Sequence, residues 1–178
     1  MIHVKIPGGR IGVLIGADGS TKRQIEERSG ATLRIDSESG SVAVDSPDPI
    51  NAMRVGEVVR AIGRGFSPEK ALSLFDDEAL VFDLIDLSDV LPTQKDIKRV
   101  KGRIIGKNGS TRELIEGLID VKISVYGKTV GIIGDVARVQ VARKAIGMLI
   151  EGVPHGTVYA YLEKKRREWK ITQSLSKE

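Results

Sequence analysis

The chain has 178 residues and a net charge of +4, which is enough length for one large domain or two small ones. Apolar residues make up 40% and aromatic residues 4%, so a packed core has to consist mostly of Ile, Val, Leu and Ala, and no apolar run reaches the roughly 18 residues of a membrane span. The absence of cysteine excludes disulfides and thiolate chemistry, and the N-terminus lacks the apolar stretch of a secretory signal, so a cytoplasmic protein is expected.

Residues 1–65 predict a first unit of strands and helices. In chain order we expect a strand over 2–6, a helix with Ile11, Leu14 and Ile15 on one face, a Gly-x-x-Gly turn at 16–19, a second helix, strands over 31–35 and 42–44, and a helix over 49–62. Asp48 and Pro49 suit the N-cap and the first position of that last helix, and Gly63 and Gly65 suit its end. Ser67-Pro68-Glu69 then begins a linker helix within residues 66–78.

The same pattern recurs 90 residues later. The segment IGADGST at 15–21 is matched by IGKNGST at 105–111, and Ile25-Glu26 is matched by Ile115-Glu116. The second copy, at 79–152, is completed by a strand over 79–87, a helix before the glycine pair, strands over 121–125 and 130–132, and a helix over 135–150. We therefore expect an α+β protein of two units, each with a three-stranded antiparallel sheet packed by three helices, followed by a basic helix over 153–178.

Charge is unevenly distributed along the chain. Residues 76–89 carry six carboxylates and no base, and their alternation with apolar residues indicates a strand with solvated carboxylates rather than a metal site. Residues 95–112 carry seven bases and one acid, and a second basic run, EKKRREWK, lies near the C-terminus. Such runs attract nucleic acid or simply form a solvated helix face.

A pair of glycines between two helices has two explanations. The simpler one is a tight turn with left-handed backbone angles. The functional one is a loop that a phosphate can approach closely, because glycine has no Cβ and the next helix points its free N–H groups and positive dipole end at the anion. One such loop is a weak signal, whereas two in the same order of strands and helices are a strong one.

This combination resembles the KH domain, the RNA-binding module whose Gly-x-x-Gly loop clamps four nucleotides. With two strands and a helix after the loop, the order is similar to the type I arrangement. The layout and the segment RIIGKNGSTRELIE resemble the archaeal KH proteins of ribosomal RNA processing, relatives of the eukaryotic partner-of-Nob pre-ribosomal factor. The resemblance implies binding of single-stranded small-subunit rRNA near its 3′ end. It also implies the rRNA-maturing endonuclease and a translation initiation factor subunit as protein partners, no cofactor, and a monomer.

The two loops differ in chemistry. Lys107 and Asn108 occupy the second, and Ser110 with Glu113 predicts a capping box for the helix that follows. In the first loop, Asp18 places a carboxylate where a phosphate would lie. We therefore predict that the second unit is the main RNA-binding unit and that the loop Gly16-Ala17-Asp18-Gly19 binds RNA weakly or faces a protein. The predicted RNA-binding residues are Lys98, Arg99, Lys101, Arg103, Ile105, Gly106, Lys107, Asn108, Gly109, Ser110 and Arg112.

Enzymatic functions find little support in the sequence. GRIIGKNG resembles a P-loop, but three residues instead of four separate Gly102 from Gly106, and Asn108 follows the lysine where Ser or Thr is needed. His3 and His155 have no companions at metal-ligand spacing, so neither a metal site nor a catalytic residue is expected.

Two further predictions concern the aromatic residues near the C-terminus and an alternative function of the protein. Tyr161 and Trp169 are attributed to packing against the core in preference to stacking on RNA bases, with the cations of 164–167 turned outward. The alternative function is a protein adaptor that docks a ribosomal or translation factor, with RNA binding secondary.

Overall fold

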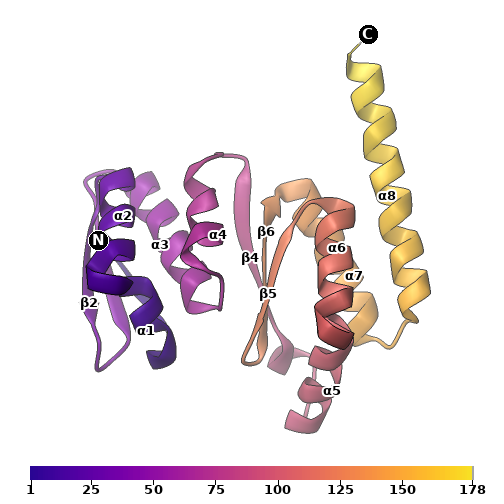
Figure 1. Ribbon diagram of the computed structural model, residues 1–178, viewed down its shortest axis with the longest axis horizontal. Coiled ribbons are helices and arrows are strands. Elements are labelled where there is room, and N and C mark those ends of the chain that lie inside the picture. The colour runs from indigo at the N-terminus through magenta and orange to yellow at the C-terminus, as the bar shows by residue number, and fades with distance from the viewer. Residues whose placement is uncertain (178) are drawn as a thin grey trace. The chain divides into compact units, whose positions relative to one another are not determined.

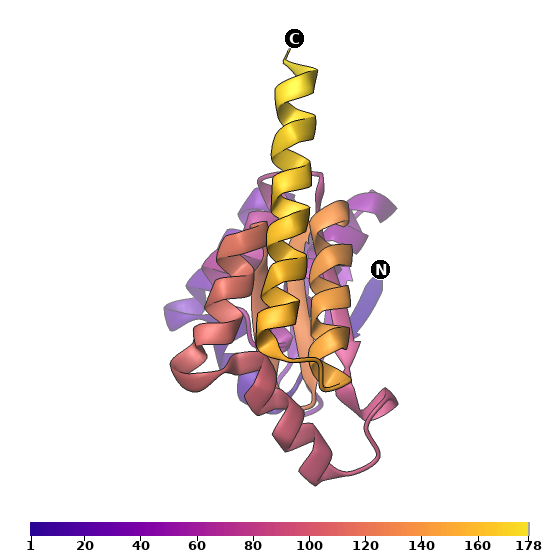
Figure 2. The ribbon, with the colours of Figure 1, turned by 90° about the vertical axis from the view of Figure 1, so that its right-hand side faces the viewer.

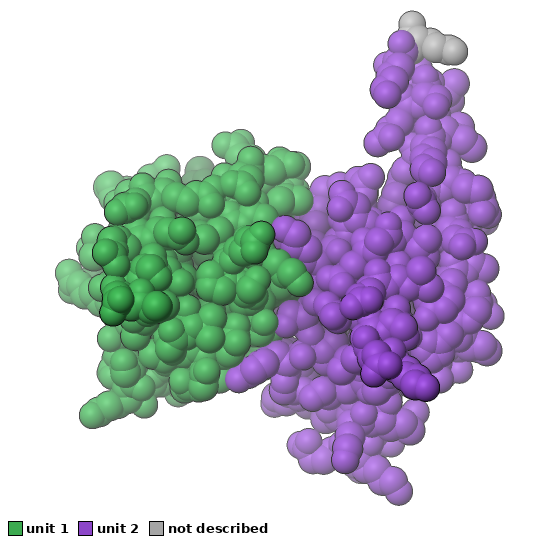
Figure 3. All heavy atoms as spheres, in the orientation of Figure 1, with its two compact units in different colours: residues 1–82 green, residues 83–178 purple. Residues whose placement is uncertain are grey.

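A computed structural model describes residues 1–177 of the chain. The chain folds into two compact units, one formed by residues 1–82 and one that begins at Asp83, shown in green and purple in Figure 3. Each unit contains one three-stranded sheet. The predicted order of strand, helix, glycine loop, helix, strand, strand and helix is confirmed in both copies, and with it the α+β class (Figure 1).

In the first unit the sheet has the strand order β1-β3-β2. Its elements are β1 (Ile2–Lys5), α1 (Gly8–Ile15), α2 (Ser20–Ser29), β2 (Thr32–Asp36), β3 (Ser41–Asp45), α3 (Pro49–Gly63) and α4 (Pro68–Leu72). Val44 of the central strand lies opposite Ile2 on one side and Leu33 on the other, so the predicted alternation places one apolar row against the helices. In the β2–β3 turn, hydrogen bonds from the side chain and backbone of Ser39 and the backbone of Glu38 hold the pKa of Asp36 below its usual range.

The second unit repeats this sheet with the order β4-β6-β5. Its sheet and helices are β4 (Leu80–Asp86), whose first three residues still belong to the first compact unit, α5 (Gln94–Ile105), α6 (Ser110–Ile119), β5 (Lys122–Tyr126), β6 (Thr129–Asp135), α7 (Val136–Ile150) and α8 (His155–Ser176). β5 and β6 pair antiparallel, with Ile123 opposite Ile132. Figure 2 shows α8 lying between α6 and α7, and Val158 and Leu162 from its first half are fully buried there.

The cores are aliphatic, as the composition predicts. The fully buried side chains of the first unit include Leu14, Ile25, Leu33, Val42, Val44, Val55 and Ile62, and those of the second include Val100, Ile104, Ile115, Ile132, Ile146 and Leu149. Each side chain of this size, moved from water into the core, contributes about 1.5–3 kcal/mol. The first-turn predictions for α3 are also confirmed, because Asp48 accepts a hydrogen bond from the Ile50 N–H at 3.0 Å and Pro49 is the first helical residue.

The segment after α3 begins as predicted. Ser67 is the N-cap of α4, and its hydroxyl accepts a hydrogen bond from the Lys70 N–H at 3.3 Å. This short helix belongs to the first compact unit and α8 to the second. The finer division into residues 1–65, 66–78, 79–152 and 153–178 stays a prediction. Of residues 1–177, none belongs to a helix long and apolar enough to cross a membrane.

Gly63, at the end of α3, is the clearest case of a glycine required by packing. A Cβ built there would lie 2.8 Å from Cβ of the buried Ile6, whereas a Cβ on Gly12, in α1, has no atom within 4 Å. We predict that Gly63→Ala destabilises the protein by about 1–3 kcal/mol through overpacking. Gly12→Ala should stabilise it by about 0.5–1 kcal/mol, because alanine loses less backbone entropy in a helix.

Chemical denaturation of the two variants beside the wild type measures the difference. A Gly63→Ala protein that unfolds at the wild-type denaturant concentration would show that Ile6 moves aside freely and that α3 does not need the glycine.

Candidate nucleic-acid interface

The two glycine loops have the same backbone. Gly16 and Gly106 end α1 and α5 with φ of +76° and +74°, Asp18 and Asn108 follow with φ of +54° and +55°, and Gly19 and Gly109 have φ of +75° and +78°. In each loop the first glycine N–H donates to the carbonyl four residues before it at 2.9 Å. The predicted turn with left-handed angles is therefore confirmed in both copies, and each loop leads directly into a helix N-terminus.

The threonine that follows each loop explains why the repeat extends beyond its glycines. Thr111 is 3% exposed and Thr21 is 8% exposed, and both pack beneath the first glycine of their loop. A Cβ added to Gly106 would lie 2.6 Å from the Thr111 backbone nitrogen, and one added to Gly16 would lie 2.7 Å from that of Thr21. Because backbone atoms cannot move aside cheaply, the first glycine of each loop is fixed by sterics as well as by its positive φ.

The predicted capping box of the second loop is wrong. Gly109 is the N-cap of α6, and Ser110 already has helical angles of −62° and −40°. A capping box requires the serine in the non-helical N-cap position, so the S-x-x-E spacing here begins one residue too late. Gly109 carries no side-chain acceptor, which leaves the first N–H groups of α6 without a cap from that position.

The middle residues of both loops are exposed, and they carry the chemical difference between the units. Asp and Asn suit the left-handed position at 18 and 108 because their short polar side chains tolerate it. The left-handed backbone conformation therefore accounts for an aspartate at position 18 without any ligand. Arg23 donates a hydrogen bond to the Asp18 carbonyl at 2.7 Å, which places a cation beside this acidic loop. Lys107 and Asn108 present a cation and an amide at the same points of the second loop.

A groove of about 610 Å³ runs between α5 and the β5–β6 turn in the second unit. It contains three of the predicted residues, Lys98, Lys101 and Ile105, together with Gly102, Gly127 and Lys128, and no acidic residue lines it. Nothing lies within 4 Å of a Cβ added to Gly102, so the helix presents bare backbone to the groove. Lys128 and Gly102 were missed by the sequence analysis. Lys128 lies in the β5–β6 turn, and it reaches the groove only because the folded hairpin places this turn beside α5.

Arg103, which the sequence analysis assigned to RNA, makes structural contacts. Its Nε donates to the Leu149 carbonyl at 3.1 Å and its Nη2 to the Val153 carbonyl at 2.6 Å, so it caps the end of α7. Arg10 does the same in the first unit, where it donates to the Ile62 and Phe66 carbonyls at 2.8 Å each. The guanidinium of Arg103 is therefore occupied inside its own unit.

Two more predicted arginines have carboxylate partners. Arg112 contacts Glu116 at 3.1 Å, and the other oxygen of Glu116 accepts the Ile123 N–H at 3.0 Å, which ties α6 to β5. Glu26 makes the matching bond to the Leu33 N–H at 2.9 Å in the first unit. Arg99 lies 3.6 Å from Asp96. Within residues 1–177, no carboxylate pairs with Lys98, Lys101, Lys107 or Lys128, so lysines carry the unbalanced charge around the groove and loop.

The disfavoured enzyme sites are not assembled in the part of the chain that the structure describes. The second loop follows α5 directly, whereas a P-loop follows a strand. No group of three His, Asp or Glu residues within 1–177 is placed to hold a metal ion. Asp83 of β4 pairs with Arg143 at 2.7 Å, and His155 contacts the Arg103 carbonyl at 3.0 Å, so both have structural partners. Tyr161 and Trp169 are half-buried, each with a cation over its ring.

Family comparisons agree with this geometry. Residues 81–167 match the family described as the second KH domain of PNO1, a eukaryotic type KH domain of type I, and residues 1–51 match the general KH domain. A KH domain-containing protein of Methanocaldococcus jannaschii is 43% identical over 94% of this chain and 74% of its own length. The RNA-binding protein pno1 of Drosophila melanogaster is 34% identical over 68% of this chain. The chain spans about half the length of that eukaryotic relative, 51%.

Solved structures give the same answer. A chain of the a/eIF2alpha-aDim2p-rRNA complex from Pyrococcus horikoshii OT3 superposes with a TM-score of 0.87 and 44% identity, covering 94% of each chain. The fold of this chain is thus shared nearly end to end with a solved relative. The chain belongs to the KH-domain family, as a tandem KH protein of the PNO1 and Dim2 type.

Proposed function

We propose that this protein binds single-stranded RNA in the groove beside the second glycine loop. The observation that carries the proposal is the charge of that groove, which has three lysines and no carboxylate among its lining residues. Lys107 adds a fourth cation at the exposed loop. A groove of this composition attracts a phosphate backbone, and its apolar floor suits unstacked bases.

The contacts divide between the loop and the groove. The loop and the first turn of α6 bind the phosphates, because Gly106 and Gly109 leave room for close approach and the helix N-terminus directs N–H groups and its dipole toward an anion. The bases enter the groove against Ile105 and the bare backbone at Gly102. Lys98, Lys101 and Lys128 neutralise the strand along the rim and do not select bases.

The RNA is proposed to be small-subunit rRNA near its 3′ end, with the protein acting as an assembly or processing factor and not as an enzyme. Support comes from the relatives, since a solved neighbour is a complex with rRNA and a fission yeast relative is named a pre-rRNA-processing protein. The same solved complex contains a translation factor subunit, which supports that partner class. The rRNA-maturing endonuclease as a partner, and a monomeric state, complete the proposal on family resemblance alone.

A protein-docking role for the first unit is the second candidate. Ile50 and Met53 of α3 are 79% and 63% exposed, and they line a hollow of about 850 Å³ together with Val81 and Phe82. Exposed apolar side chains beside a hollow are typical of a protein-binding surface. With Asp18 in its loop, this unit is better equipped for a protein than for a phosphate backbone.

The identical loop backbones allow the side chains to be exchanged without strain. We predict that Lys107→Ala/Asn108→Asp, which gives the second loop the sequence of the first, weakens binding of single-stranded RNA about tenfold or more, because it removes a charged contact and adds a carboxylate beside a phosphate. The fold should be unchanged, since aspartate already occupies this position at φ +54° in the first loop.

The reciprocal variant, Ala17→Lys/Asp18→Asn, is the control and should not weaken binding. Fluorescence anisotropy with one labelled RNA measures both. Full affinity in a folded Lys107→Ala/Asn108→Asp protein would show that the second loop does not hold the RNA.

A second test fills the groove with a side chain without changing the charge of its lining. Gly102→Leu adds a side chain where no atom lies within 4 Å and where leucine favours the helix, so the protein should be at least as stable as the wild type. We predict that its RNA affinity nevertheless falls severalfold, because the new side chain occupies the space of a base.

Gly12 stands 90 residues earlier, in the matching place of α1, and is equally open. If the first unit contributes little, Gly12→Leu should leave RNA affinity unchanged in the same titration. Equal decreases in the two variants would overturn the unequal roles of the units, and wild-type affinity for Gly102→Leu would remove the groove from the proposal.

A further inference from the structure

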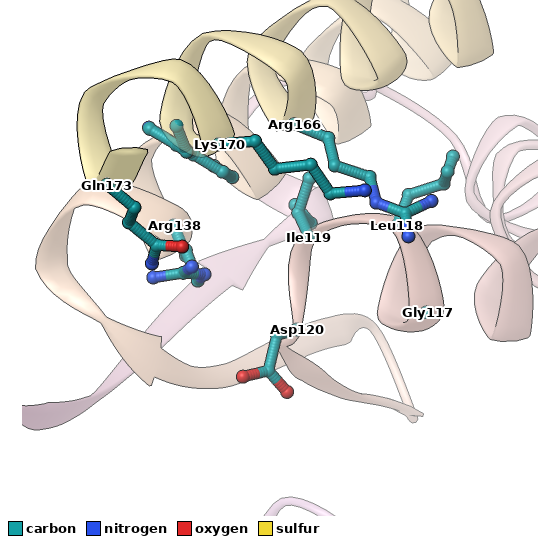
Figure 4. Close-up of a pocket in the computed structure, with 9 residues that line it drawn as sticks. Gly117, Leu118, Ile119, Asp120, Arg138, Arg166, Lys170 and Gln173 are labelled. Carbon is teal, nitrogen blue, oxygen red and sulfur yellow. The ribbon is translucent and has the colours of Figure 1, made fainter. Parts of the chain in front are cut away.

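A second basic hollow lies in the second unit, where α6 ends against α8. It has a volume of about 180 Å³, and Leu118, Asp120, Arg138, Arg166, Trp169 and Lys170 are among the residues that line it (Figure 4). The groove beside the glycine loop shares none of these residues. α6 separates this hollow from the glycine loop by its ten residues, about 15 Å along the helix axis.

The cations of the hollow come from two helices, and two of them have no internal partner. Of the basic run on α8, Lys165 is paired with Glu168 at 3.4 Å. Arg166 and Lys170, one helical turn apart, have no ion pair with any of residues 1–177. Asp120 is the one carboxylate among the lining residues, and Figure 4 shows it pointing away from the ends of Arg166 and Lys170.

Arg138 supplies an independent observation. Its guanidinium is held between Asp135, at 2.6 Å, and the ring of Trp169, 4.9 Å from its centroid, yet its Nε is buried and has no hydrogen-bond acceptor within the described chain. A buried N–H without an acceptor is costly and rare in native proteins. The hollow thus presents two unbalanced cations, next to an arginine whose buried Nε has no acceptor.

We propose that this hollow binds a phosphate of the RNA strand that leaves the glycine loop along α6. The inference rests on the proposed RNA-binding function, and it extends the RNA path to a second anchoring point. Phosphate is the ligand because the donors here are cationic and a phosphodiester offers several acceptor oxygens in a small space. The contact reads no base, so it adds affinity and direction without sequence preference.

The distance between the two sites provides the test. A tetranucleotide fills the glycine loop and its groove but does not reach along α6, whereas a twelve-nucleotide RNA does. For Arg166→Gln/Lys170→Gln, affinity for the tetranucleotide should equal that of the wild type. Affinity for the longer RNA should fall about threefold or more at low salt. The slope of log affinity against log salt should flatten by about 0.7 for each phosphate that the variant no longer neutralises.

The matched control is Lys164→Gln/Arg167→Gln, which removes the same charge from exposed positions of the same helix that do not line the hollow. It should leave both affinities and the slope closer to the wild type. Arg166→Lys/Lys170→Arg keeps the charge and should restore binding of the longer RNA. Thermal melting of all variants detects any loss of α8 packing.

Each outcome separates this inference from the proposed function. Equal effects of the hollow and control variants would mean that α8 acts only through its overall charge, and no effect of either would mean that the strand does not pass the hollow; both results overturn the inference. A wild-type protein that binds neither RNA would instead overturn the proposed function.

Discussion

The close approach between the first loop glycine and the backbone of the threonine five residues later is the constraint on which both units depend. It ends one helix, reverses the chain through two left-handed residues and starts the next helix with its N-terminus exposed. A side chain at either first glycine would push apart the two helices that the loop joins, α1 and α2 in the first unit or α5 and α6 in the second. The geometry proposed to bind phosphate is thus a by-product of packing, and the first unit has the same loop backbone although Asp18 places a carboxylate there.

A shared backbone and divergent side chains agree with the two roles proposed for the two units. Structural contacts are kept in both copies, as in the Glu26 and Glu116 bonds to the following strand. Other contacts recur at a different position of the repeat. Arg10 of α1 and Arg103 of α5 each cap the C-terminal end of the last sheet-packing helix of their unit, α3 and α7, but they do not stand at matching positions of the two copies. The exposed loop residues differ in charge between the copies, whereas the backbone angles of the two loops agree within a few degrees.

Local signals in the sequence were enough for the architecture. The order of elements, the Asp48 cap and the aliphatic core follow from periodicity and from residues next to one another in the chain. The capping box failed because the loop glycine, with its left-handed angles, takes the N-cap position from Ser110. Arg103 and Lys128 could not be assigned from sequence, because each depends on a partner far along the chain that only the folded unit brings near.

The internal partners of the basic residues also show why a run of bases in the sequence predicts more nucleic-acid contacts than the structure leaves available. Of the seven bases in residues 95–112, Arg103 and Arg112 satisfy internal carbonyls or carboxylates and Arg99 lies beside Asp96. A planar guanidinium makes several directed bonds and suits such internal duties, whereas an ammonium on a flexible stem loses less by remaining solvated. Lysines are therefore left as the free charge around the groove. Arg166 departs from this division in the second unit, because within residues 1–177 its guanidinium has no ion pair and stands beside a hollow, which distinguishes α8 from an ordinary solvated helix.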